Sequence, residues 1–187
     1  MVDVLDSSTG KVSEGKMPFF VVSPMKFAVM TFFVMGFYWL YCFYCSWKQH
    51  REATGEEISP FWRSFFAIFF IYPLLKRADD RIRDSGLTYH WNILGLTLGY
   101  YGLCVVGIVI SVVLADQLWP AYIAGFVFQL ALLLILVPMQ KGINFSAGDE
   151  AGVGNSRFTG ANWVWISLCT AFRMMQFVAL VELSSMM

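Results

Sequence analysis

Long apolar blocks separated by short polar stretches constrain this chain more than any other feature. Residues 93–115 contain no charged side chain, and neither do residues 118–138. Each block is long enough to cross a ~30 Å hydrocarbon layer at ~1.5 Å per helical residue. The apolar residues lie in runs and do not alternate with polar ones, so they are not one face of a soluble helix or strand. The blocks therefore predict an all-α membrane protein.

The composition supports the same class. Hydrophobic residues make up 58% of the 187-residue chain and charged residues 14%, against ~45–50% and ~25% in soluble domains. The length predicts one domain. The formal net charge is zero, which offers nucleic acid no attraction, so we expect no nucleic-acid partner.

The blocks predict a polytopic transmembrane helical bundle within residues 19–140, after a mobile polar N-terminus at 1–18. We expect four crossings, at about 24–47, 59–84, 92–115 and 118–140. A polar, Gly-rich loop covers 141–162, and a fifth, C-terminal hydrophobic helix covers 163–185. This last helix contains Arg173, which is expensive in lipid, so a crossing and a position along the interface both stay open.

The segment at 59–84 leaves two topologies open. Its apolar part, residues 61–75, is interrupted by Arg63 and Ser64 and is barely long enough to span. We expect it to cross, with entry and return on one side as the alternative. Four basic residues lie in the loop 76–92, and the positive-inside rule makes that loop cytoplasmic. The side of the N-terminus stays open, because a segment that only dips into the membrane would reverse it.

An aromatic motif runs through the first segment and the start of the second. It is formed by Val22, Ser23, Lys26, Phe27, Val29, Met30, Gly36, Tyr38, Tyr41, Phe43, Tyr44, Trp47, Pro60, Arg63, Ser64, Phe65, Phe66, Phe69 and Phe70. The pattern G-x-Y-x-x-Y-[WC]-[FY]-Y, followed by P-x-x-R, resembles an uncharacterised family of small bacterial multi-pass membrane proteins that are DUF4234-like. Cys42 stands where that family usually has Trp, and Met35 where Thr or Leu is typical. The resemblance implies a bacterial inner-membrane protein and implies no activity.

Arg63 and Arg173 are basic residues inside apolar segments, with Gln129 and Glu182 as further polar groups. One interpretation is an ion path or a site for an anionic lipid headgroup. The other is pairing with a neighbouring helix, or, for Arg63, snorkelling to the interface. Pairing or snorkelling is favoured, because transporters that couple to ions bury acidic residues at mid-depth and the first four segments have none there.

Cys42 and Cys45 form a C-x-x-C, a spacing that lets two thiols cycle with a disulfide. No base is adjacent, and cysteine is a common apolar filler, so helix packing is favoured over redox chemistry. Gly95, Gly99 and Gly36 are candidate packing residues, since small residues let helix backbones approach closely. Their neighbour is either a partner subunit or another segment of this chain.

The only histidines, His50 and His90, flank separate segments and lack an E-x-x-H. We expect both to be solvated, with no metal site and no cofactor. The chain has no phosphate-binding loop, no G-x-S-x-G and no H-E-x-x-H. Whether it is an enzyme stays open, with a non-enzymatic role favoured.

The sequence therefore predicts a non-enzymatic accessory or scaffold protein of the bacterial inner membrane. It would act through helix contacts with membrane lipid, with a membrane protein partner or with a second copy. The alternatives are a small transporter, a lipid-handling protein or a membrane thiol-redox enzyme, and a further one is an immunity protein against a toxin. A cavity beside Arg63, Arg173 or the cysteine pair would favour the transporter or the redox enzyme.

Overall fold

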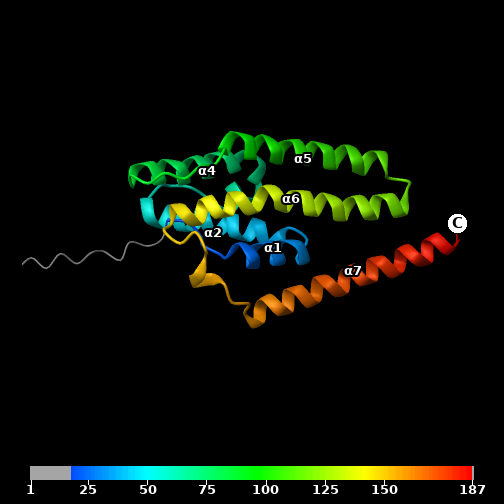
Figure 1. Cartoon of the computed structure of the whole chain (residues 1–187). Coiled ribbons are helices and arrows are strands. Elements are labelled where there is room, and N and C mark those ends of the chain that lie inside the picture. Colours follow the sequence, from blue (N-terminus) through cyan, green and yellow to red (C-terminus); the bar gives the residue numbers. More distant parts are fainter. Residues whose placement is uncertain (1–17, 187) are drawn as a thin grey trace, which may run out of the picture.

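The computed structural model describes residues 18–186 and contains helices and loops but no strand in that range. Its elements are α1 (Pro24–Phe33), α2 (Phe37–Thr54), α3 (Pro60–Phe65), α4 (Ala67–Asp84), α5 (Ile93–Val113), α6 (Leu118–Ser146), the 3-10 turn η1 (Val153–Asn155) and α7 (Gly160–Met186) (Figure 1). This confirms the all-α class. The helices α5, α6 and α7 are long and apolar enough to cross a membrane, so the chain is a membrane protein. Residues 1–17 of the expected mobile N-terminus at 1–18 lie outside the described residues.

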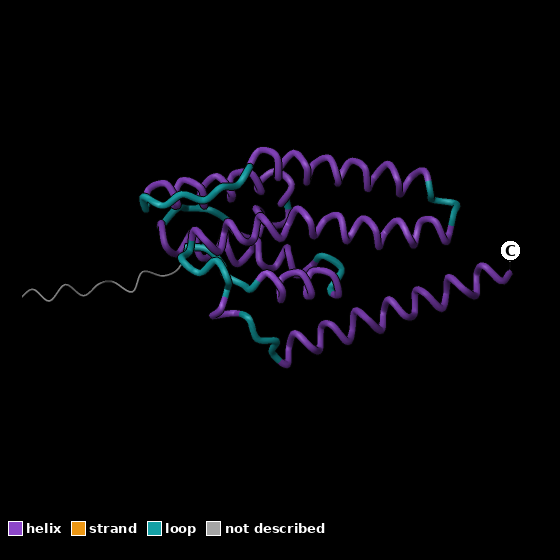
Figure 2. Tube along the Cα trace, in the orientation of Figure 1, coloured by secondary structure: helices purple, strands orange, loops and turns teal. Residues whose placement is uncertain are grey.

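The first apolar segment folds back on itself, so the prediction of one crossing helix at 24–47 is wrong. α1 ends at Phe33 and α2 begins at Phe37, with Met35 (φ 55°) and Gly36 (φ 84°) in the left-handed conformation between them. α1 then packs against α2, and the turn lies partway along α6 (Figures 1 and 2). Gly36, expected to pack against another helix, serves this turn: a Cβ there would meet nothing within 4 Å.

The second apolar segment also folds back on itself, so the expected single helix at 59–84 is replaced by two helices. The helix breaks at Phe66, between the short α3 and the longer α4. Arg63 on α3 and Arg77 on α4 lie 4.2 and 5.3 Å from the centre of the Trp47 ring. In one continuous helix these two arginines would be about 21 Å apart along the axis. The chain therefore folds back between Arg63 and Arg77.

α5 and α6 form an antiparallel pair with one close approach at a predicted packing residue. A Cβ on Gly99 would lie 3.1 Å from Cδ1 of Ile135 on α6, so Gly99 packs within the chain. Gly95 makes no such contact between helices. A Cβ there would meet the side chain of Asn92, whose Oδ1 caps the helix by accepting from the Gly95 amide.

α6 continues beyond its expected end at residue 140, and its last turns bind the extended residues 18–23. Asn144 is fully buried; its amide nitrogen donates to the carbonyls of Val22 (2.8 Å) and Glu150 (3.2 Å), and its Oδ1 accepts from the Val22 amide. Gln140 also donates to Oδ1 of Asn144 (2.9 Å). These bonds give partners to backbone groups that have no helix of their own.

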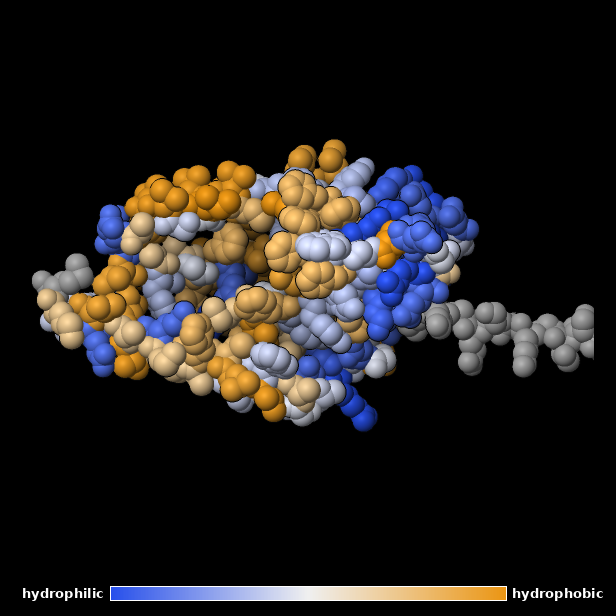
Figure 3. All heavy atoms as spheres, turned by 180° about the vertical axis from the view of Figure 1, so that it is seen from behind, coloured by the Kyte–Doolittle hydropathy of each residue, from blue (hydrophilic) through white to orange (hydrophobic). Residues whose placement is uncertain are grey.

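Charged residues gather at one end of the molecule, the polar end, where α2, α4 and α6 finish. Figure 3 shows hydrophilic residues at that end and hydrophobic ones over most of the remaining surface. The distal end holds the turn at 114–117 and the last residues of α7. The helices α1 to α4 lie beside the half of α5 and α6 nearest the polar end, while α5, α6 and α7 continue to the distal end (Figure 1).

Candidate functional site

A groove of about 870 Å³, the lateral groove, lies between the α1–α2 hairpin and α7. It is lined by Phe20, Lys26, Met30, Val34, Phe37, Tyr38, Tyr41, Asn155, Thr159, Ala161, Asn162, Trp165 and Cys169. Its walls come from parts of the chain that are far apart in sequence, and folding of the hairpin against α7 brings them together. A mostly apolar concavity with a few convergent polar groups is typical of a ligand site.

Lys26 lies in the groove wall near the polar end. It is 4% exposed, and its Nζ donates to Oδ1 of Asn155 (2.7 Å) and to the carbonyl of Arg157 (2.8 Å). Both acceptors are neutral, and none of the ion pairs within residues 18–186 includes Lys26. An ammonium has three N–H donors, so these contacts leave one donor, and the charge, for a ligand.

The polarity of the lateral groove changes along its length. Lys26, Asn155 and Asn162 line the part nearest the polar end, where α1 and α7 begin. Val34 and Phe37 line the other part, at the turn between α1 and α2. The lining of the groove therefore changes from polar to apolar along its length, as the structure of an amphiphile does.

The depth of the groove follows from contacts between α1 and α6. The carbonyl of Phe32, close to the turn, accepts from Nε2 of Gln129 (3.0 Å), which lies near the middle of α6. The helical rise from Lys26 to Val34 is about 12 Å at ~1.5 Å per residue. That length is close to half of a ~30 Å hydrocarbon layer.

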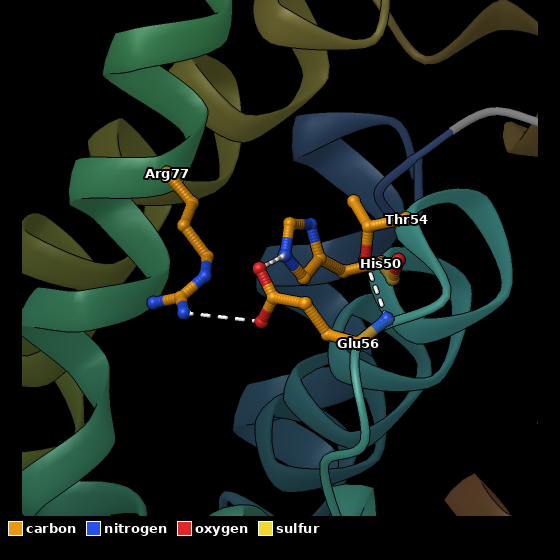
Figure 4. Close-up of polar contacts among 4 residues, drawn as sticks. All are labelled: His50, Thr54, Glu56 and Arg77. Carbon is orange, nitrogen blue, oxygen red and sulfur yellow. Dashed lines mark hydrogen bonds and ion pairs between the residues drawn. The ribbon is translucent and has the colours of Figure 1, made fainter.

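A second cluster of polar side chains lies at the polar end around Glu56, in the loop between α2 and α3 (Figure 4). The Glu56 carboxylate lies 3.5 Å from Nε2 of His50 and 3.2 Å from Nη2 of Arg77. Oγ1 of Thr54 donates to the His50 carbonyl and accepts from the Glu56 amide. The cluster ties α2 to α4, beside a pocket of about 640 Å³ whose lining carries both signs of charge.

His50 is buried, which corrects the expectation that it is solvated. It is 7% exposed, and its ring stacks on Phe19 at 5.4 Å between centroids. Burial lowers the pKa of His50 because it disfavours the charged imidazolium. The nearby Glu56 raises this pKa, while Arg77 and Arg63 lower it, and the net pKa lies below its ordinary value.

We expect the free energy of unfolding to fall as the pH drops below about 6.5, toward the folded-state pKa of His50. In that window the unfolded chain binds a proton that the folded chain does not, so protonation favours unfolding. His50→Gln should flatten this dependence, and His90→Gln, at an exposed position of the same end, should keep it. The measurement is reversible unfolding between about pH 8 and about pH 5.5, above the range of ordinary carboxylates. Equal slopes in wild type and His50→Gln would contradict the prediction.

Arg63 stacks on aromatic rings near the polar end. Its guanidinium carbon lies 4.2 Å from the ring centroid of Trp47 and 5.3 Å from that of Phe70. Contacts of this kind stabilise by ~0.5–2 kcal/mol. Arg63 is absent from the lining of the lateral groove. Its stacking agrees with the favoured interpretation, in which Arg63 pairs with a neighbouring helix.

Arg173 lies near the middle of α7 and binds the end of α1. Its Nη2 donates to the carbonyl of Phe32 (3.1 Å) and to Oε1 of Gln129 (2.6 Å). The last carbonyls of a helix lack helical partners and carry its partial negative charge. The guanidinium therefore pairs with a helix end, between three helices, and takes no part in the lining of the groove.

The cysteine pair lies on α2 at the edge of the core. Cys42 is 1% exposed, Cys45 is half-buried, and both thiols are free. Thiol exchange needs a thiolate that a partner disulfide can reach, so the burial of Cys42 favours packing. No group of three His, Cys, Asp or Glu side chains within residues 18–186 is placed to hold a metal ion.

Sequence reasoning did not single out the residues that line the lateral groove. Lys26 belongs to the aromatic motif, and a charge in the first turn of an otherwise apolar helix was the available signal. Asn155 and Trp165 carried no signal, because only the fold brings them beside α1. The comparisons with family models, with curated proteins and with solved structures found no match to this chain.

Proposed function

We propose that this chain is a non-enzymatic accessory protein of the bacterial inner membrane that binds a membrane lipid in the lateral groove. The observation that carries the proposal is the change of polarity along the groove, from Lys26 and Asn162 at one end to Val34 and Phe37 at the other. A lipid has the same arrangement of head and tail. The length of the groove along α1, close to half of a ~30 Å hydrocarbon layer, supports the same ligand.

Binding is favoured over catalysis by the residues of the groove. General acids and bases in enzymes are most often His, Asp or Glu, and none of these within residues 18–186 lines the groove. The group of such side chains around Glu56 and His50 lies outside this lining, and His50 lines the separate polar-end pocket. The lateral groove thus offers a counter-charge and apolar walls to a ligand.

The orientation that we propose places the polar end in the cytoplasm. Every Lys and Arg of residues 18–186 except Arg173 lies in the half of the molecule nearest that end, in 26–83 and 141–157. The turn at 114–117 has none. Because cytoplasmic loops of membrane proteins are enriched in Lys and Arg, the loop 76–92 would face the cytoplasm and the turn would face outside. The proposed placement in bacteria rests on the resemblance to the DUF4234-like family.

The test is to fill the lateral groove and count retained lipid. Cys169→Trp places an indole in the groove, whereas Leu168→Trp places it on a neighbouring exposed position outside the lining. Native mass spectrometry of protein taken from its own membranes should show bound lipid on wild type and Leu168→Trp, and much less on Cys169→Trp. Equal retention in both variants would overturn the proposal. A stoichiometric protein partner without lipid would instead support a scaffold that works through protein contacts.

A further inference from the structure

We propose that the lipid held in the lateral groove is anionic, and that its phosphate or carboxylate group pairs with Lys26. This inference rests on the lipid-binding function proposed above and adds the charge of the head group. It concerns one lipid bound at the polar half of the groove, with its tail running along α1 toward Val34.

The first observation is the unbalanced charge of Lys26. A buried ammonium is stable when it is both hydrogen-bonded and paired with an opposite charge. Asn155 and the carbonyl of Arg157 satisfy the first condition. The described part of the chain supplies no carboxylate within ion-pair distance for the second. An anionic head group in the groove would supply it.

The second observation is that Lys26 is the only charged residue among residues 18–186 that lines the lateral groove. A zwitterionic head group would bring its own cation into this space, where no Asp or Glu of the described residues lines the wall to receive it. A head group with net negative charge brings no such cation. The groove therefore selects against zwitterionic lipids as well as for anionic ones.

The third observation is a further donor beside Lys26. Oδ1 of Asn162 accepts from the amide (2.9 Å) and the hydroxyl (3.1 Å) of Thr159, which turns its amide nitrogen away from that partner. This nitrogen takes part in none of the hydrogen bonds among the described side chains, and Asn162 lines the groove. An ammonium from α1 and an amide from α7 that line the same groove suit the oxygens of a phosphate or carboxylate.

The experiment compares two lipids with identical tails. Full-length protein is stripped of lipid in detergent and titrated with dioleoylphosphatidylglycerol or with dioleoylphosphatidylcholine, and native mass spectrometry counts the bound lipid. We expect wild type to bind the anionic lipid about tenfold more tightly, a factor that corresponds to ~1.4 kcal/mol. A parallel titration with inorganic phosphate reports whether a free anion suffices.

Three variants locate the preference. Lys26→Met removes the charge and should bind both lipids equally, while Lys26→Arg should retain the preference. Lys48→Met removes the same charge from an exposed position of the polar end and should behave as wild type. Loss of the preference in Lys48→Met as well would assign it to the general surface charge and overturn the inference.

The remaining outcomes separate this inference from the proposed function. Tight and equal binding of both lipids to wild type would leave the lipid-binding function standing and overturn the anionic head group. Failure of wild type to bind either lipid would overturn both. Binding of inorganic phosphate as tight as that of the anionic lipid would overturn a lipid ligand in favour of a free anion. These wild-type titrations decide the matter even if Lys26→Met does not fold.

Discussion

Asn144→Leu should release the extended residues 18–23 from α6 and lower the free energy of unfolding by about 3–6 kcal/mol. The Asn144 amide uses all of its hydrogen-bonding positions, with two bonds donated and two accepted. Leucine is similar in size but leaves the Val22 amide, the Val22 carbonyl and the Glu150 carbonyl without that partner. Each buried polar group left unsatisfied costs ~1–3 kcal/mol; the two groups of Val22 are buried, whereas Glu150 is exposed and its carbonyl costs less.

The measurements are unfolding in a denaturing detergent and hydrogen exchange at the Val22 amide, which should become much faster in Asn144→Leu. Ser146→Ala is the matched control, because the Ser146 hydroxyl is buried on the same helix but bonds only to the Ile143 carbonyl within it. Its effect should stay near ~1 kcal/mol. Unchanged exchange at Val22 in Asn144→Leu would show that Asn144 does not hold the extended segment.

Arg173→Leu should detach the middle of α7 from the bundle and lower the free energy of unfolding by about 4–7 kcal/mol. In the folded protein the guanidinium binds the Phe32 carbonyl and Gln129, and hydrogen bonds between membrane helices contribute ~0.6–1.7 kcal/mol each. When the helices separate, Arg173 meets lipid at a cost of ~2.5–3.5 kcal/mol. Leucine removes the bonds from the folded state and that cost from the separated one, so both changes weaken the fold.

Cross-linking between cysteines placed at Trp119 and Phe177, whose rings lie 6.0 Å apart across α6 and α7, reports the position of α7. The background for this experiment replaces the native cysteines by alanine. Cross-linking should drop in Arg173→Leu and persist in Arg173→Lys, which keeps a charged donor. Glu182→Gln serves as the control. It removes a charge from the same helix, and Glu182 forms no ion pair within residues 18–186. Full cross-linking in Arg173→Leu would contradict the anchoring role.

The three long helices were predictable because hydropathy is a local property. A charge-free apolar run must be helical in lipid, where every backbone group needs an internal partner. The runs after Asn92 and Gln117 therefore became α5 and α6 close to the expected starts, and the last run became α7. The end of α6 was missed, because its last turns are held by contacts with residues 18–23.

The two hairpins were not predictable from segment length. The first segment has enough apolar residues to cross, and Gly36 alone does not require a turn there. The break becomes favourable because the carbonyl of Phe32, freed where α1 ends, finds donors on Gln129 and Arg173 from distant parts of the chain. Stacking of Arg63 and Arg77 on Trp47 likewise closes the second hairpin. Neither set of contacts has a signature within one segment.

The sequence by itself determined the membrane class, the helical content and the gathering of positive charge around loop 76–92, since hydrophobicity and charge act locally along the chain. Only the tertiary structure decided how deep each apolar segment goes and which side chains meet. Lys26 became a candidate ligand-binding residue when α7 and Asn155 closed a groove beside it. Whether a buried charge is paired or free to bind a ligand depends on neighbours that are distant in sequence, and only the fold brings them together.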